Sequence, residues 1–314
     1  MELRNLGRSG LRVSLVGLGC NNFGGRIELE ASRKVVHKAL DLGITLFDTA
    51  DTYGNFGGSE TCLGEILGGR RKDIVLASKF GMPMNAEGTI KGASRGYIMS
   101  EVEASLKRLK TDWIDLYQLH QPDPLTPIEE TLRALDDLVH QGKVRYIGCS
   151  NLPAWQVVEA QWTARELGLN AFVSAQDEYS LVVRAVDREL IPALQAYDMG
   201  LLPFFPLASG LLTGKYKRNA ALPAGTRLAN AQRLADRFLT EANWQIAERL
   251  QDFASTRGHS LLELAFSWLA CRPQVASVIA GATKPEQLEL NAKAASWVLT
   301  PAEMAEIDRI TKPE

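Results

Sequence analysis

The sequence at residues 47–55 reads Phe47-Asp48-Thr49-Ala50-Asp51-Thr52-Tyr53-Gly54-Asn55. It continues a short apolar run, residues 44–47, of the kind that forms a buried strand. Asp48 therefore stands where a strand ends, and Tyr53 stands in the loop directly after it. A carboxylate and a phenol at this place gain meaning only if other strands bring reactive side chains to the same point.

The same unit, a short apolar strand followed by a longer segment with helical periodicity, recurs along the chain. We predict eight strands, at residues 14–19, 44–47, 74–78, 114–119, 144–148, 172–175, 200–204 and 277–280. In the helix that follows residue 100, charged residues are expected outside, and the inner stripe consists of Val102, Ser105, Leu106 and Leu109. Pro127 suits the opening of the next helix and Gly142 suits its end.

Eight such units with almost continuously apolar strands indicate a parallel sheet that is buried on both faces. An open doubly wound sheet is the alternative, but the number of units and the motif positions favour a closed α/β fold, the (β/α)8 TIM barrel. Residues 7–10 predict the turn of a small N-terminal β-hairpin that plugs one end. We therefore expect residues 1–314 to form one barrel domain with extra C-terminal helices and loops. Residues 206–240 read as one long irregular region, of the length that lids and binding loops have.

The composition narrows the range of partners and compartments. The chain has 314 residues, 46% hydrophobic and 23% charged, with a net charge of -2, so neither nucleic acid nor an anionic membrane is expected as a partner. The N-terminus is too polar for a signal peptide, and no apolar run approaches a membrane span. Cysteines and histidines lack the spacing of metal ligands, so we predict no metal site and a reducing, cytoplasmic setting.

Two further strands end in reactive side chains. Lys79 follows the third predicted strand and His120 the fourth, and the carboxyl ends of barrel strands form the active site of this fold. Each residue alone has an ordinary structural role, but all four at successive strand ends favour one shared site. Tyr53 would donate a proton to a carbonyl oxygen, Lys79 would lower the pKa of the phenol, Asp48 would balance the lysine, and His120 would orient the carbonyl.

These four residues, in Phe47-Asp48-Thr49-Ala50 with Tyr53, Ser78-Lys79 and His120, resemble the catalytic tetrad of the aldo-keto reductase family. The resemblance extends from the hairpin to about residue 291. It implies that tyrosine is the general acid, that lysine and aspartate tune it, and that histidine positions a small-molecule carbonyl substrate. It also implies a nicotinamide dinucleotide, usually NADPH, bound extended across the mouth of the barrel.

The resemblance assigns further residues to the cofactor. Ser150, Asn151 and Gln176 match the positions that hold the nicotinamide carboxamide, and Phe204 matches a ring-stacking residue that is often Tyr or Trp. The other expected cofactor contacts near the ring and pyrophosphate are Gly19, Cys20, Asn21, Asp48, Phe205, Pro206, Leu207, Ala208, Gly210 and Lys215. Substrate contacts are expected from Tyr53 and His120 and from Asn22 and Phe23 in the first loop.

The segment after the eighth strand matches the family's site for the adenosine 2′-phosphate. The residues expected there are Gly281, Thr283, Lys284, Gln287 and Asn291. Many members have arginine where Gln287 stands and an acid where Leu290 stands, so the phosphate clamp lacks a charge that Lys284 or Arg227 would have to supply. NADPH is the expected cofactor, and use of NADH stays open.

The first functional hypothesis is an NADPH-dependent reductase of aldehydes or ketones, which would run backwards as an alcohol or sugar dehydrogenase. The second is a nicotinamide-binding regulatory subunit, because residues 122–127 and 209–216 resemble the potassium-channel β-subunits of the same superfamily. Those subunits have asparagine at the position of His120, which favours the enzyme. A metal-assisted lyase lacks its carboxylate cluster. We expect a monomer or a weak homo-oligomer.

Overall fold

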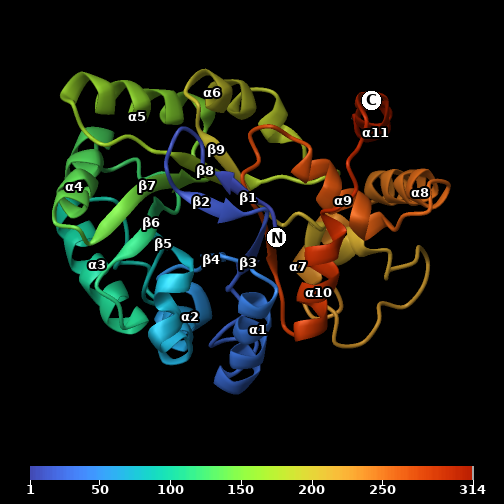
Figure 1. Ribbon diagram of the computed structural model, residues 1–314, viewed down its shortest axis with the longest axis horizontal. Helices are drawn as coiled ribbons and strands as arrows, with labels where there is room; N and C mark the ends of the chain where they lie inside the picture. Colours follow the sequence, from blue (N-terminus) through green and yellow to red (C-terminus); the bar gives the residue numbers. More distant parts are fainter. Residues whose placement is uncertain (313–314) are drawn as a thin grey trace.

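The repeated strand-helix unit forms a barrel of eight parallel strands surrounded by helices (Figure 1). The structure is a computed structural model and describes residues 1–312. The strand order is β10-β3-β4-β5-β6-β7-β8-β9, so each strand lies beside the next one in the chain and the last returns to the first. The predicted (β/α)8 fold is confirmed, including the N-terminal hairpin and the additional C-terminal helices.

The strands are β1 (Leu3–Asn5), β2 (Arg12–Ser14), β3 (Val16–Gly19), β4 (Leu46–Asp48), β5 (Val75–Phe80), β6 (Ile114–Leu119), β7 (Val144–Ser150), β8 (Ser174–Glu178), β9 (Gly200–Phe204) and β10 (Val278–Gly281). The helices are α1 (Leu29–Asp41), α2 (Tyr53–Leu67), α3 (Arg95–Leu109), α4 (Ile128–His140), α5 (Ala154–Leu167), α6 (Leu190–Ala196), α7 (Gln232–Phe238), α8 (Glu241–Ser255), α9 (Leu261–Ala270), α10 (Pro285–Ala294) and α11 (Pro301–Thr311). Three 3-10 turns, η1 (Gly68–Asp73), η2 (Ala185–Asp187) and η3 (Ala208–Thr213), complete the elements of residues 1–312.

The barrel closes between β9 and the residues just before β10. Leu201 forms a parallel bridge with Val275 there. The Leu201 amide donates to the carbonyl of Gln274 at 2.6 Å, and the Ala276 amide donates to the carbonyl of Leu201 at 3.1 Å. This single bridge replaces the ladder that joins the other neighbouring strands.

The inner face of the barrel changes character along its axis. Near the amino ends of the strands, Leu46, Ala77 and Leu116 pack with the hairpin residues Leu6 and Val13 in one apolar cluster. The hairpin of β1 and β2, drawn in blue in Figure 1, lies across this end. Because strand side chains alternate with a period of two, the next inward position on each of these strands lies nearer the carboxyl end, and there the residues are polar.

Several sequence predictions differ from the structure in detail. The sixth barrel strand begins two residues later than residue 172, which places Gln176 inside β8 rather than after it. The expectation that charged residues of α3 lie outside is wrong for Glu101, which is only 7% exposed and bonds Arg108. The inner stripe of α3 itself is buried as predicted.

The boundaries of two other segments also differ. Pro127 is the residue before α4 rather than its first residue, while Gly142 follows the helix with a φ of 74°, as a terminating glycine should. The region 206–240 is less irregular than predicted, because it contains η3 and α7. Within residues 1–312, no helix combines the length and the apolar character needed to cross a membrane.

The hairpin is seated by a glycine, which gives a test of the fold. Gly7 has a φ of 57°, and a Cβ there would lie 2.6 Å from both the Gly200 nitrogen and the Val173 oxygen. We expect Gly7→Ala to lower the free energy of unfolding by about 1–3 kcal/mol, because strain adds to a backbone clash. Urea unfolding measures this, and Gly96→Ala, at a position with open space, is the control. An unchanged midpoint for Gly7→Ala would contradict the packing described.

Candidate active site

A fully buried lysine lies at the centre of the polar end of the barrel. Lys79 Nζ donates to Asp48 Oδ2 at 2.8 Å, to the Thr49 carbonyl at 2.8 Å and to Tyr53 Oη at 3.4 Å. The side chain of Lys79 has no exposed surface, and that of Asp48 is 5% exposed. The ammonium therefore has a charged partner, a carbonyl and the phenol as its three acceptors.

The strand register brings these residues together. In the parallel pairing, Asp48 lies beside Ala77 and Lys79 lies beside Gln118. Asp48, Lys79 and Gln118 each come two residues after an apolar inward residue, so all three point into the barrel. Tyr53 comes from the start of α2, which places its phenol over the mouth of the same strands.

His120 completes the group. Its ring lies edge-on to the Tyr53 ring, with 5.5 Å between centroids and 79° between planes. The His120 amide donates to the Phe80 carbonyl at 2.9 Å, and its own carbonyl accepts from Asn151 Nδ2 at 3.0 Å. Among the described residues, buried His120 Nδ1 has no hydrogen-bond partner. The backbone of His120 is thus fixed while its ring stays available.

Gln118 is a part of the site that the sequence analysis missed. Asp48 Oδ1 accepts from Gln176 Nε2 at 2.8 Å and from Gln118 Nε2 at 3.5 Å, so both amides hold the carboxylate. Gln118 stands two residues before His120, and strand alternation alone would have placed it on the same inner face.

The protonation states follow from burial and neighbouring charge. Burial disfavours the charged form of Lys79, but Asp48 and Tyr53 outweigh burial and raise the pKa of the ammonium. Burial, with a smaller contribution from Lys79, holds the pKa of His120 well below its usual value. Lys79 is therefore charged and His120 neutral at physiological pH.

Lys79 acts to lower the pKa of the Tyr53 phenol, as predicted, but the net pKa is raised. Burial raises the pKa of the phenol, and the opposing effect of Lys79 is smaller. Tyr53 is therefore protonated at neutral pH, and the ammonium beside it can stabilise a phenolate that forms during a reaction.

The predicted carboxamide residues lie together beside His120, at the ends of β7 and β8. Ser150 Oγ donates to the Gln176 carbonyl at 2.8 Å, and Asn151 Nδ2 donates to Ser150 Oγ at 3.0 Å. Gln118 Oε1 and Ser209 Oγ are buried and lack a partner within residues 1–312, as His120 Nδ1 does. These unpaired polar atoms around the barrel mouth fit a polar ligand such as a carboxamide-bearing cofactor.

The segment after β9 presents its backbone in an unusual way. Phe205, Ala208 and Ser209 have φ values of 51°, 46° and 57°. The Phe204 and Phe205 rings contact edge-on with centroids 5.4 Å apart, and the Arg227 guanidinium lies 4.9 Å from the Phe205 ring centre. Pro206 and Gly210 are buried, Leu207 is half-buried, and Lys215 is exposed. This strained loop with two cations suits an anion.

The segment after β10 meets the first loop. Gly19 pairs with Gly281, and a Cβ at Gly281 would lie 3.0 Å from Asn22 Nδ2 and 3.2 Å from Asn21 Oδ1. Cys20 is buried, and its amide donates to the Asp48 carbonyl at 2.8 Å.

The start of α10 is covered by its own side chain. Gln287 Oε1 accepts from the Thr283 amide at 2.8 Å. The glutamine therefore occupies a donor that an anion would use. Lys284 is exposed at the start of this helix, whereas Asn291 is buried within it.

The two residues expected to contact substrate from the first loop are both buried. Phe23 is fully buried in the hydrophobic core and presents no surface to a ligand. Asn22 is 6% exposed and faces Gly281, and its Nδ2 donates to the Ala282 carbonyl at 3.4 Å. A turn-rich loop sequence does not show which of its side chains are buried.

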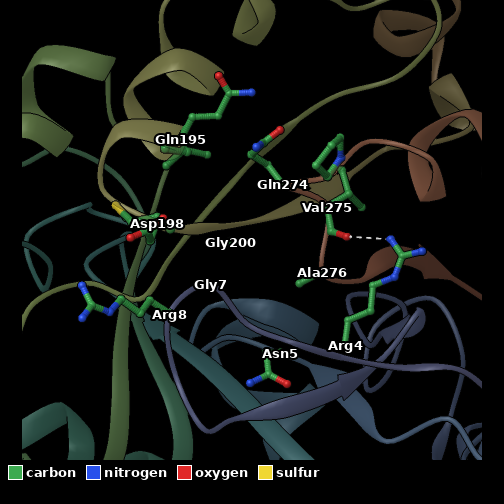
Figure 2. A pocket seen from close by; sticks show the side chains of 13 residues that line it. Arg4, Asn5, Gly7, Arg8, Gln195, Asp198, Gly200, Gln274, Val275 and Ala276 are labelled. Atoms are coloured by element: carbon green, nitrogen blue, oxygen red, sulfur yellow. Dashed lines mark hydrogen bonds between the residues drawn. The ribbon is translucent and has the colours of Figure 1, made fainter. Parts of the chain in front are cut away.

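A cavity of about 490 Å³ lies at the opposite end of the barrel, beside the hairpin (Figure 2). Arg4, Arg8, Asp198 and Gln274 are among its lining residues, and none of the four tetrad residues reaches it. Arg4 Nη1 is already bonded to the carbonyls of Ala270 and Val275. The chemistry therefore belongs to the barrel mouth rather than to this cavity. Residues 1–312 hold no group of three potential metal-ligating side chains.

Comparison with known proteins identifies the class. The sequence model of the Aldo/keto reductase family matches residues 15–312. The chain therefore belongs to the aldo/keto reductase family and is an NAD(P)H-dependent oxidoreductase of that class.

Individual relatives carry two kinds of name. A probable voltage-gated potassium channel subunit beta from Oryza sativa subsp. japonica is 38% identical, over 99% of this chain and 97% of the relative. The L-glyceraldehyde 3-phosphate reductase of Escherichia coli (strain K12) is 36% identical, over 98% of this chain and 92% of the relative. An uncharacterized oxidoreductase of Bacillus subtilis (strain 168) is 36% identical, over 94% of this chain and 91% of the relative.

Asp177, next to Gln176, gives a test of the electrostatics. Burial raises its pKa to about 8, and its Oδ2 has no hydrogen-bond partner among the described residues. Between about pH 4 and pH 8 the folded protein holds this proton and the unfolded chain does not, so Asp177 makes stability fall as the pH rises.

We expect Asp177→Asn to remove this loss. The variant should gain stability over the wild type by up to about 1.4 kcal/mol per pH unit across that window, with little difference at pH 4. Urea unfolding at pH 4, 6 and 8 measures the gain. A difference that does not change with pH would show that Asp177 is ionised in the folded protein.

Proposed function

We propose that this protein reduces the carbonyl group of a small aldehyde or ketone to an alcohol, reversibly, with NADPH as cofactor and Tyr53 as general acid. The contact of the Lys79 ammonium with both Asp48 and Tyr53 at 2.8 Å and 3.4 Å is the observation that supports this most directly. A fully buried cation is costly unless neighbouring groups balance its charge and accept its hydrogen bonds. Such a cation would assist the transfer of a proton to the substrate oxygen, next to a bound hydride donor.

The chain's own residues then have separate roles. When bound, the nicotinamide supplies the hydride. Tyr53 donates its proton to the carbonyl oxygen, and Lys79 stabilises the phenolate that results. Asp48, held by Gln118 and Gln176, keeps the ammonium charged and in place. Neutral His120 donates an N–H to the carbonyl oxygen and orients it.

The cofactor would be held at both ends. Ser150, Asn151 and Gln176 suit the carboxamide, because hydroxyl and amide groups offer donors and acceptors together. Lys215 and Arg227 suit the pyrophosphate, and Lys284 with the start of α10 suits the 2′-phosphate. NADPH is favoured because no acidic side chain among these proposed contacts would prefer a free ribose hydroxyl.

The name of the Escherichia coli relative, L-glyceraldehyde 3-phosphate reductase, supports a small aldehyde as the substrate class. The similarity to this relative covers 98% of the present chain and therefore includes the whole barrel mouth.

Replacing the acid tests the mechanism. We expect Tyr53→Phe to lower kcat for carbonyl reduction by about 10²–10⁴-fold, because the proton donor is lost, while the Kd for NADPH changes little. NADPH oxidation, followed by absorbance against a panel of aldehydes and ketones, measures the first, and fluorescence titration measures the second. Tyr146→Phe, on a tyrosine that packs at the hairpin end, is the matched control. Retention of more than a tenth of kcat by Tyr53→Phe would assign the proton to another group.

Replacing the helix-start glutamine tests cofactor choice. Gln287→Arg should lower the Kd for NADPH by about 10-fold and leave the Kd for NADH unchanged, because a guanidinium adds a charge-assisted bond to the 2′-phosphate. Gln287→Glu should act in the opposite direction on NADPH alone. If both dinucleotides respond equally, the 2′-phosphate does not lie at the start of α10.

A second function is favoured by one observation. The rice relative, named as a probable potassium channel subunit, is 38% identical over 99% of this chain. A nicotinamide-binding regulatory subunit would copurify with a channel protein from membranes and would turn over no carbonyl on a broad panel. The neutral His120 beside Tyr53 favours the enzyme, so we expect turnover and no such partner.

A further inference from the structure

The segment that carries Tyr53 has a backbone conformation that needs outside support. Gly54, Asn55, Phe56 and Gly57 have φ values of 69°, 60°, 63° and 105° in succession. Asn55 and Phe56 are not glycines, and a left-handed conformation is unfavourable for such residues, more so for Phe56 than for Asn55. Contacts from other elements must therefore keep Tyr53 beside Lys79.

Arg108, in the last turn of α3, supplies one of these contacts. A Cβ on Gly57 would lie 2.5 Å from Arg108 Cδ, so the arginine packs directly on the end of the left-handed run. Arg108 Nε donates to Glu60 Oε2 at 2.7 Å, and Glu60 is fully buried in α2. The same guanidinium bonds Glu101 and, at 3.1 Å, Ser105 Oγ on its own helix.

Glu60 connects this arginine to the strand that carries the lysine. Its second oxygen, Oε1, accepts a hydrogen bond from Ser78 Oγ, and Ser78 precedes Lys79 in β5. Successive side chains of a strand point to opposite faces, so holding Ser78 outside the barrel sets the direction of Lys79 inside it. The Glu60 carboxylate thus bonds both Arg108, which supports the Tyr53 segment, and Ser78, in the strand that carries Lys79.

Burial and the ion pair act in opposite directions on the pKa values of Glu60 and Arg108. Burial raises the pKa of Glu60, and Arg108 is the largest opposing influence. For Arg108, burial acts to lower the pKa, but Glu60 and Glu101 outweigh burial and raise it. Separating the two groups would leave each charge buried without its partner, which is unfavourable. The ion pair therefore keeps a fixed geometry.

We infer that Arg108 and Glu60 are positioning residues for the reduction, which hold the Tyr53 phenol and the Lys79 ammonium at contact distance without touching either. The inference rests on the proposed function only in assigning the pair to that reaction. A displacement of reacting groups by about 1 Å lowers rates by about 10²-fold, so the pair is a strong determinant of kcat.

The double variant Glu60→Gln with Arg108→Gln tests this, because it removes both charges of the pair. It also removes the arginine partner of Glu101, so the comparison with the control is made at a matched loss of Tm. We expect kcat to fall by about 10–100-fold, with the carbonyl KM and the NADPH Kd within about 3-fold of wild type. The matched control is Arg71→Gln with Asp115→Asn, a similarly buried pair at 2.8 Å whose side chains are 8% and 15% exposed, at the amino ends of β5 and β6. At a comparable loss of Tm, the control should keep kcat within about 3-fold.

A conservative variant and a structural measurement complete the test. Arg108→Lys keeps a cation for Glu60 and should recover most of the kcat that Arg108→Gln loses. In a crystal structure of the double variant, we expect Tyr53 Oη and Lys79 Nζ to lie more than the present 3.4 Å apart. An unchanged distance, or equal kcat losses in the two double variants at matched Tm, overturns the inference. If the wild type reduces no carbonyl, the proposed function fails, whereas the distance still decides the positioning role.

Discussion

The buried ion pair between Lys79 and Asp48 constrains the rest of the structure. The lysine side chain is fully inaccessible, and its Nζ lies 2.8 Å from the carboxylate. Breaking such a pair from one side costs about 3–5 kcal/mol, because a charge is left unpaired and buried away from water. Three strands must therefore keep their register, since β4 carries the anion, β5 the cation and β6 one of the amides that hold the anion.

The barrel meets this demand by dividing its interior. Its lower half is an ordinary apolar core that includes Leu46, Ala77 and Leu116, sealed by the hairpin. At the next inward-facing position of each strand, nearer its carboxyl end, the lining becomes polar, with Asp48, Lys79 and Gln118. The apolar half provides the rigidity, and the polar half uses it to hold charged groups where water would otherwise solvate them.

The sequence was sufficient for the fold and for the four mouth residues, because both depend on features that lie within a few residues of each other. A strand end followed by Asp48 or Lys79 is local information, and eight repeats of one unit leave few topologies. The net direction of the Tyr53 pKa shift was not predictable, because it depends on how much protein surrounds the phenol. Glu60 and Arg108 were missed for a related reason: a charge that faces a buried partner looks the same in sequence as one that faces solvent.

The joint between β9 and β10 has a consequence for the empty and loaded forms of the protein. Within residues 1–312 it is bridged only at Leu201 and Val275, whereas each other pair of adjacent barrel strands shares a ladder. The two segments that leave this joint, after β9 and after β10, are the ones we assign to the phosphates of the dinucleotide. A molecule lying over both would cross-link the barrel where its own hydrogen bonding is thinnest. Binding of the cofactor and closure of the barrel would then be coupled. Hydrogen exchange at the joint would therefore report what fraction of the protein has cofactor bound.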